Sequence, residues 1–154
     1  MTIEDDIAFF ERVPTLNLLG RAALRILAIG AESRYVHSGE VLFSAGEQAD
    51  SGFVVQEGKF RLTPQESEGE RTVTVGAGTL FGELAMLTET TRPVTATALE
   101  PSTVLRIPRT LFLRMLEGYP DAARRLRDLI ASRTDQSARD IYNVRTVLDE
   151  PERR

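Results

Sequence analysis

The sequence predicts a mainly β fold with flanking helices, of the double-stranded β-helix or jelly-roll class. Between Arg34 and Pro108, short apolar runs alternate with turn residues, and eight of the eleven glycines lie from Gly39 to Gly82. Before and after this region, apolar residues recur at helical spacing instead. Short strands separated by regular turns favour two packed sheets or a jelly roll, so the helices are expected to flank it.

The N-terminal region, residues 3–30, is expected to be helical, with an interruption at Val13-Pro14 because proline has no backbone donor. A second helix then ends at Gly30. Its apolar face consists of Leu16, Leu19, Ala23, Leu24, Leu27 and Ala28. We expect this face to pack against the sheets, as the apolar side of a surface helix does.

Six strands are expected in the central region, each bounded by glycine, proline or polar turn residues. They are Val41–Phe43, Gly52–Gln56, Lys59–Thr63, Arg71–Val75, Val94–Ala98 and Thr103–Ile107. The polar and acidic segment from Pro64 to Glu70 is predicted to be an exposed hairpin loop.

Helical spacing returns after Pro108. A short helix is expected over Thr110–Glu117, ended by Gly118, and a long helix opens at Pro120-Asp121. Residues 131–140 hold no large apolar side chain, so the long helix either continues through them or bends there.

The length indicates one domain. We assign residues 1–120 to the jelly roll with its N-terminal helices, and residues 121–154 to the long C-terminal helix of the same domain. That helix is a candidate for homodimerisation, and packing on its own domain is the alternative.

Composition excludes several classes of function. Because there is no cysteine, disulfides, cysteine nucleophiles and thiolate metal sites are ruled out. The only histidine, His37, is too few for a histidine metal site or a Ser-His-Asp triad, so we expect no metal and no catalytic residue. The net charge of −4 is spread without a basic patch, which argues against nucleic acid as a partner.

Localisation is predicted from what the sequence does not contain. Its start is acidic and unlike a secretory signal, and no run approaches the roughly 20 apolar residues of a membrane span. We therefore expect a cytoplasmic protein with no membrane partner.

Residues 81–92 form the segment best suited to a ligand. Gly82 allows close approach of the backbone, because it has no Cβ. Glu83–Leu87 has good helix formers for about one turn, and the start of a helix offers N–H groups to an anion. Arg92 can add a guanidinium to the same anion, and Glu83 can accept a hydrogen bond from a sugar hydroxyl. The segment predicts a pocket for a small ring phosphate; a surface ion pair from Arg92 to Glu89 is the alternative.

This segment resembles the phosphate-binding cassette of cyclic nucleotide-binding domains. The family pattern is Phe-Gly-Glu-Leu/Met-Ala, a short loop, then Arg, two small residues and Thr, at the spacing of the regulatory subunit of cAMP-dependent protein kinase. The matching residues are Phe81, Gly82, Glu83, Leu84, Ala85, Arg92 and Thr95. The likeness extends over roughly residues 8–130.

The resemblance implies a ligand-sensing regulatory domain and not an enzyme. Its regulatory ligand would be cAMP, with cGMP as the close alternative, and it would need no other cofactor. Arg92 would neutralise the cyclic phosphate, the amides of Leu84 and Ala85 would donate to it, and Gly82 would admit it. Glu83 would accept from the ribose 2′-hydroxyl. Binding would reposition the helices after Pro108. For the N-terminal helices, the resemblance offers a moving lid that reports ligand binding as the alternative to simple packing.

Pro93 departs from the family pattern and bears on both affinity and selectivity. Family members usually place Ala, Ser or Thr here, and the N–H of that residue helps to hold the phosphate. Proline lacks this N–H, and a hydrogen bond to a charged group is worth about 1.5–3 kcal/mol. Pro93 also lacks the hydroxyl that members preferring cGMP often carry, so the resemblance favours cAMP.

Two other functions remain open from the sequence. One is the sensor part of a catabolite-activator-type transcription regulator, whose DNA-binding domain would follow the long helix. The other is a degenerate module for interaction or oligomerisation that binds no nucleotide, which Pro93 favours. In the catabolite activator family, the long helix pairs with its copy and a Ser or Thr on it reaches the base. The candidates are Ser132, Thr134 and Ser137. The downstream protein partner is unknown.

Overall fold

The computed structural model describes residues 2–65 and 72–140, and for residues 133–140 it describes only the backbone. The helical elements are α1 (Ile3–Phe10), η1 (Leu16–Leu18), α2 (Arg21–Gly30), η2 (Glu83–Met86), α3 (Arg109–Gly118) and α4 (Pro120–Asp140). The strands are β1 (Glu32–Val36), β2 (Val41–Phe43), β3 (Gln48–Ala49), β4 (Ser51–Glu57), β5 (Lys59–Pro64), β6 (Val73–Gly76), β7 (Leu80–Phe81), β8 (Thr90–Thr91), β9 (Val94–Ala98) and β10 (Ser102–Pro108).

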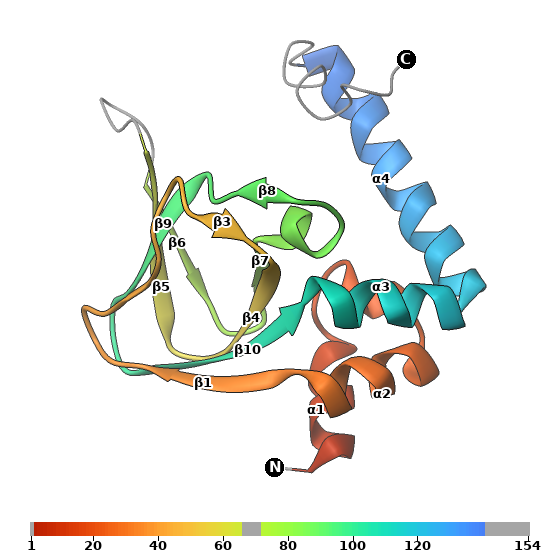
Figure 1. The fold of residues 1–154 in the computed structure, drawn as a ribbon, viewed down its shortest axis with the longest axis horizontal. Helices are drawn as coiled ribbons and strands as arrows, with labels where there is room; N and C mark the ends of the chain where they lie inside the picture. Colours follow the sequence, from red (N-terminus) through yellow and green to blue (C-terminus); the bar gives the residue numbers. More distant parts are fainter. Residues whose placement is uncertain (1, 66–71, 141–154) are drawn as a thin grey trace.

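Two four-stranded antiparallel sheets form the centre of the molecule, with strand orders β1-β10-β4-β7 and β2-β9-β5-β6. A short ribbon pairs β3 with β8. The helices gather at one end of the sheets, where α1, α2 and α3 lie together (Figure 1). The predicted jelly roll with flanking helices is therefore confirmed.

The strands that the sequence predicts are present, and four further strands are not in the prediction. β2 and β9 have the predicted bounds, and β4, β5 and β10 extend by one residue at one or both ends. Of the predicted strand at Arg71–Val75, Arg71 lies outside the described residues, as does most of the predicted loop at Pro64–Glu70. The missed strands are β1, whose residues are mostly exposed, and the two-residue strands β3, β7 and β8, which are too short to show a period.

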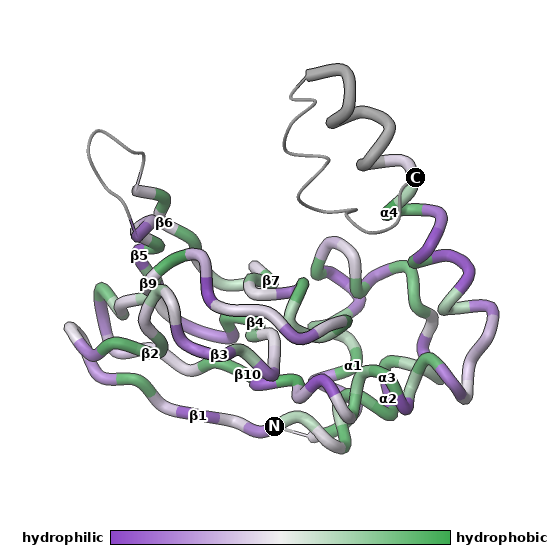
Figure 2. The backbone as a smooth tube through the Cα atoms, turned by 45° about the horizontal axis from the view of Figure 1, so that its top comes forward, coloured by the Kyte–Doolittle hydropathy of each residue, from purple (hydrophilic) through white to green (hydrophobic). Residues whose placement is uncertain are grey.

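The interior is divided into two cores. One lies between the sheets and contains aromatic side chains, including Phe43, Phe53, Phe60 and Phe81. The other is formed by the helices, η2 and the outer side of β4 and β10. Hydrophobic stretches, drawn in green, lie where α1, α2 and α3 meet, whereas β1 is drawn largely in purple (Figure 2). The cassette thus lies between a sheet core and a helix core.

The N-terminal helices differ from the prediction in one respect. The six residues expected on one apolar face are all buried. The second helix nevertheless begins at Arg21, because Gly20 has a φ of 94°, which is not helical. Leu16–Leu18 forms a separate 3₁₀ turn before it. Thr15, at the start of that turn, has φ of 79°, which is unfavourable for a β-branched residue.

The C-terminal helices begin and end close to the predicted residues. α3 is one residue longer than predicted at each end, and α4 begins at Pro120. The backbone of α4 stays helical to Asp140, so it continues through the segment without large apolar residues. Its first turns pack on the domain, with Ala122 and Leu126 buried, and the helix then extends away from α3 (Figure 1).

The hydroxyl residues proposed to reach the base, and the last residues of the chain, lie at or beyond the end of what the structure describes in full. Ser132 is exposed, the side chains of Thr134 and Ser137 are not described, and residues 141–154 lie outside the described residues. Within the described part of the chain, no helix combines the length and the apolarity that a membrane span requires.

Candidate functional site

The cassette begins with a glycine that the backbone geometry requires. Gly82 follows β7 and adopts φ 76° and ψ 24°, the left-handed region in which side chains with a Cβ are strained. The predicted helical turn is the 3₁₀ turn η2. Within this turn the N–H of Ala85 donates to the carbonyl of Gly82 at 3.2 Å. A phosphate that takes this N–H would replace an internal hydrogen bond.

A groove of about 440 Å³ opens beside this turn. It is lined by Gly82, Glu83, Leu84, Ala85, Thr90, Thr91 and Pro93. Five of the seven predicted site residues therefore share one groove. The two threonines of β8 were missed; their signal in the sequence is a pair of hydroxyl side chains directly before Arg92. Leu84 is 46% exposed, which places an apolar side chain at the groove.

Arg92 lies directly behind the groove wall and does not line it. Its side chain is buried, with 5% exposure. Nη1 donates to the carbonyl of Ser51 at 2.9 Å, and Nη2 donates to the Ser51 hydroxyl at 3.3 Å. Nη1 also lies 2.8 Å from the position that a Cβ on Gly82 would take, so glycine leaves room for the guanidinium. The alternative of a surface ion pair to Glu89 is therefore wrong.

The charge of Arg92 has no direct counterion. None of the ion pairs formed among the described residues includes Arg92. Burial lowers the pKa of Arg92, while the negative charges of Asp50 and Glu47 act against that change. An arginine remains protonated even so, and a buried cation without a paired anion is costly.

Asp50 is the acidic side chain that would be the natural partner, but it is engaged elsewhere. Its carboxylate lies 3.1 Å from Nη2 of Arg106. Burial acts to raise the pKa of Asp50, but hydrogen bonds from Ser51 and Arg106 outweigh it, and the net pKa is lowered. Asp50 is therefore ionised at neutral pH and pairs with Arg106, which leaves Arg92 open to an incoming anion.

Thr95 lies apart from the groove. It is half-buried in β9, and its Oγ1 accepts a hydrogen bond from the N–H of Ala45 at 2.9 Å. This bond joins β9 to the turn that follows β2. The structure thus gives Thr95 a contact that supports the strands, and it does not bring Thr95 to the other predicted residues.

Arg109 was not predicted and holds the other end of the cassette. Its Nη1 lies 3.0 Å from the carbonyl oxygen of Ala85 and 3.1 Å from those of Ala49 and Thr88. The side chain therefore joins the start of α3 to the end of the η2 turn and to β3. The sequence carries no signal for this role, because an arginine at a helix start is most often on the surface.

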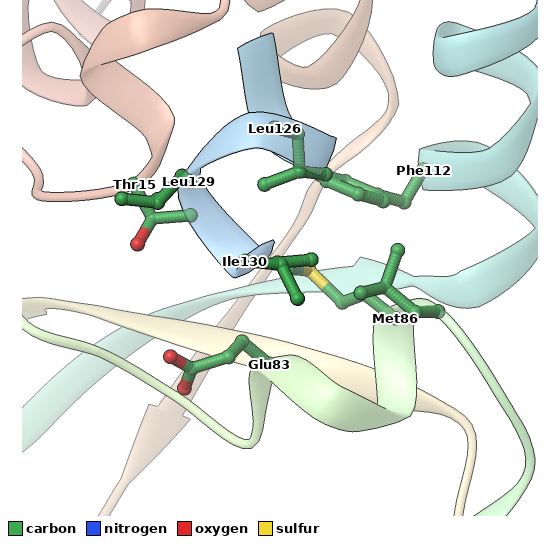
Figure 3. Close-up of a pocket in the computed structure, with 8 residues that line it drawn as sticks. Thr15, Glu83, Met86, Phe112, Leu126, Leu129 and Ile130 are labelled. Carbon is green, nitrogen blue, oxygen red and sulfur yellow. The ribbon is translucent and has the colours of Figure 1, made fainter. Parts of the chain in front are cut away.

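An apolar cavity of about 40 Å³ separates the cassette from the helices. It is lined by Thr15, Glu83, Met86, Leu87, Phe112, Leu126, Leu129 and Ile130. Figure 3 shows the leucine and isoleucine side chains of α4 above Met86, with Glu83 at the opposite end of the turn. Met86 is 1% exposed, as expected for a core residue. Because Glu83 lines both the groove and this cavity, it connects the ligand side with α4.

A metal centre has no support in the part of the chain that the structure describes. No group of three or more histidine, aspartate or glutamate side chains is placed there to hold an ion.

Comparison with known proteins identifies one family. The family model of the cyclic nucleotide-binding domain matches residues 33–119. Lysophospholipase NTE1 of Pyricularia oryzae is 33% identical over 137 residues, which are 88% of this chain but 8% of that protein. The chain therefore spans a small part of its curated relatives.

Solved structures agree with the family model. A cyclic nucleotide-binding-like protein from Brucella abortus is 36% identical, with a TM-score of 0.64 over 73% of this chain and 98% of that one. The catabolite activator protein of Thermus thermophilus is 26% identical, with a TM-score of 0.70 over 85% of this chain and 62% of that one.

Proposed function

This chain belongs to the cyclic nucleotide-binding domain family, as its cassette predicted, and on that premise we propose that it is a sensor that binds cAMP at Gly82 and Arg92. The fold is that of a regulatory domain and not of a catalytic one. The cyclic phosphate would lie where the η2 turn meets the guanidinium, and the rest of the nucleotide would occupy the groove.

The observation that carries this proposal is the burial of the Arg92 guanidinium without an ion pair among the described residues. Asp50 and Glu47 act on this guanidinium at a distance, but it is only 5% exposed and has no ion pair among the described residues, so it lacks a directly bonded anion. A phosphate supplies that anion and accepts charge-assisted hydrogen bonds. Gly82, which has no side chain, separates Arg92 from the groove, so an anion can approach from that side.

The remaining contacts follow from the groove lining. Glu83 lines the groove and would accept a hydrogen bond from the ribose 2′-hydroxyl, and the amides of Leu84 and Ala85 would donate to the phosphate. Pro93 supplies neither an N–H nor a hydroxyl to the groove, which favours cAMP over cGMP. Thr95 would support the site through β9 rather than touch the nucleotide.

Ligand binding would reach the helices through the cassette. Glu83 and Met86 lie against Leu126 and Ile130 of α4 across the apolar cavity, and Arg109 fixes the same turn to α3. A shift of η2 on binding would therefore change the packing of both helices, since a ligand selects the state with which it interacts better. The helix α4 would pass this change to a second copy or to a downstream protein.

A degenerate module that binds no nucleotide is the second candidate. Two observations favour it: Pro93 cannot donate, and the N–H of Ala85 already has an acceptor in Gly82. Under this function α4 would serve association alone. The sensor is the better supported of the two, because an interaction module has no need of a buried, unpaired arginine.

Calorimetric titration of the chain with cAMP, cGMP and 2′-deoxy-cAMP tests the proposal. We expect cAMP to bind most tightly and the 2′-deoxy analogue more weakly. Glu83→Gln should reduce the preference for the 2′-hydroxyl, because a carboxylate accepts more strongly than an amide. Equal affinity of the wild type for cAMP and its deoxy analogue would exclude Glu83 as the ribose contact, and absence of all binding would favour the degenerate module.

A further inference from the structure

The buried guanidinium of Arg92 lies on an aromatic surface. Its Cζ is 4.2 Å from the centroid of the Phe43 ring and 5.4 Å from that of Phe53. Both rings belong to a cluster in the sheet core, with centroids 5.7 Å apart from each other. A cation over the face of an aromatic ring is attracted by the ring quadrupole, most strongly where water is excluded.

Two different groups therefore fix the orientation of Arg92. The carbonyl and hydroxyl oxygens of Ser51 accept hydrogen bonds from one edge of the guanidinium. The ring of Phe43 lies against one of its faces. An edge and a face together define the plane of a planar group. The bonds to Ser51 use two of the five N–H donors, so others remain for a ligand.

Phe43 itself is held firmly. It ends β2, is 6% exposed, and packs against Phe53 and also against Phe81 at a centroid distance of 5.8 Å. A buried ring packed closely between other rings gives the guanidinium a well-defined surface.

We propose that Phe43 is a positioning residue, which holds the guanidinium of Arg92 by a cation–π contact in the orientation that receives the cyclic phosphate. This inference rests on the proposed function for its effect on affinity. It does not rest on it for the contact itself, which is given by the distance from Arg92 Cζ to the Phe43 ring. Phe43 has no place in the cassette pattern, and the sequence alone shows it only as an apolar residue of a predicted strand.

Phe53 is the matched control. It is the same residue type, lies in the same cluster and is buried to a similar degree, at 3% exposure. Its ring is farther from the guanidinium, so Phe43→Leu and Phe53→Leu remove similar apolar area but different amounts of cation–π contact. Comparing the two variants thus separates the positioning effect from a loss of packing.

The first measurement is cAMP affinity by calorimetry. We expect Phe43→Leu to weaken binding by about fivefold to thirtyfold, the range that a cation–π contact in a desolvated site would give. Both variants should lower the melting temperature by similar amounts, because both remove buried ring area. Phe53→Leu should weaken cAMP binding less than Phe43→Leu does. Equal losses of affinity in the two variants would overturn the proposal, because packing alone would then explain them.

The second measurement needs no nucleotide. A double-mutant cycle on melting temperature combines Phe43→Leu with Arg92→Met, and the same cycle is made with Phe53→Leu. We expect Phe43 to couple with Arg92 more strongly than Phe53 does. Additive shifts in the Phe43 cycle would refute the contact, whatever the nucleotide results. A wild type that binds no cyclic nucleotide, together with a coupled cycle, would overturn the proposed function and leave Phe43 as the residue that orients Arg92.

Discussion

The two ends of the cassette are held by two arginines whose donors are used differently. At its start, Arg92 lies behind Gly82 with two hydrogen bonds to Ser51 and no ion pair among the described residues. At its end, Arg109 places one nitrogen near the carbonyl oxygens of Ala49, Ala85 and Thr88. Arg109, which is half-buried, thus joins three backbone segments through one nitrogen, whereas Arg92 is buried and has N–H donors that Ser51 does not use.

This difference indicates which arginine serves structure and which serves the ligand. A side chain that joins several backbone carbonyls contributes to stability, and its removal leaves those acceptors without that donor. A buried charge without a counterion costs stability, and the protein gains from it only when an anion binds. The two arginines should thus respond to substitution with opposite signs in stability.

The largest effect is expected from Arg92→Met. This variant should lose most cyclic-nucleotide binding, because a charged hydrogen-bonding partner of the phosphate is worth about 1.5–3 kcal/mol or more, roughly tenfold to over a hundredfold in affinity. Its melting temperature should stay unchanged or rise, since an apolar side chain of similar length replaces a buried unpaired charge. Calorimetric titration and thermal unfolding measure the two effects.

Arg92→Met also has a clear contrary result. Unchanged affinity would remove this site from the function. A large fall in melting temperature with no nucleotide present would show that Ser51 and the aromatic cluster already satisfy the guanidinium, and the comparison between the two arginines would no longer hold.

Arg109→Met should act in the opposite direction on stability. We expect a loss of about 1–2 kcal/mol, discounted because the side chain is only half-buried, which is a fall of about 2–8 °C in melting temperature. Nucleotide binding should weaken less than in Arg92→Met, because the turn loosens but the charge at the phosphate remains.

Arg109→Lys is the matched control for this prediction. A lysine keeps the charge but not the planar guanidinium, so it should recover part of the stability at most. If Arg109→Met unfolded at the wild-type temperature, the contacts to Ala85 and Thr88 would contribute nothing measurable, and α3 would be joined to the cassette by apolar packing alone.

The same contrast explains what the sequence could and could not predict. Gly82 and Arg92 belong to a local pattern, so their proximity follows from spacing within one segment. Arg109 meets the cassette only through the return of β10, and no local pattern records that contact. Phe43 lies under Arg92 for the same reason, because the pairing of β2 with β9 brings them together.

The fold was more predictable than the site because its signals are repetitive. β9, with the predicted bounds, and the six buried apolar residues of the N-terminal region follow from periodicity alone. β3 and β8 have two residues each, and they exist because the chain on either side is already paired. Thr95 fits the family pattern in sequence, yet it points to the backbone of Ala45 because the direction of a side chain depends on strand register.

The smallest effect, and the one that sharpens the comparison most, is expected from Pro93→Ala. Pro93 is exposed and lines the groove, so the substitution adds an N–H on the ligand side without disturbing either arginine. Affinity for cAMP should rise by up to about tenfold, the lower end of what a hydrogen bond to a charged group gives. The melting temperature should fall slightly, because alanine has more conformational freedom in the unfolded chain.

Pro93→Thr adds a hydroxyl as well and should shift competition toward cGMP. If the wild type already prefers cGMP, the base is read elsewhere, and Thr90 and Thr91 are the groove hydroxyls to substitute next. If Pro93→Ala binds cAMP no better than the wild type, the guanidinium of Arg92 and the η2 amides satisfy the phosphate without an N–H at this position.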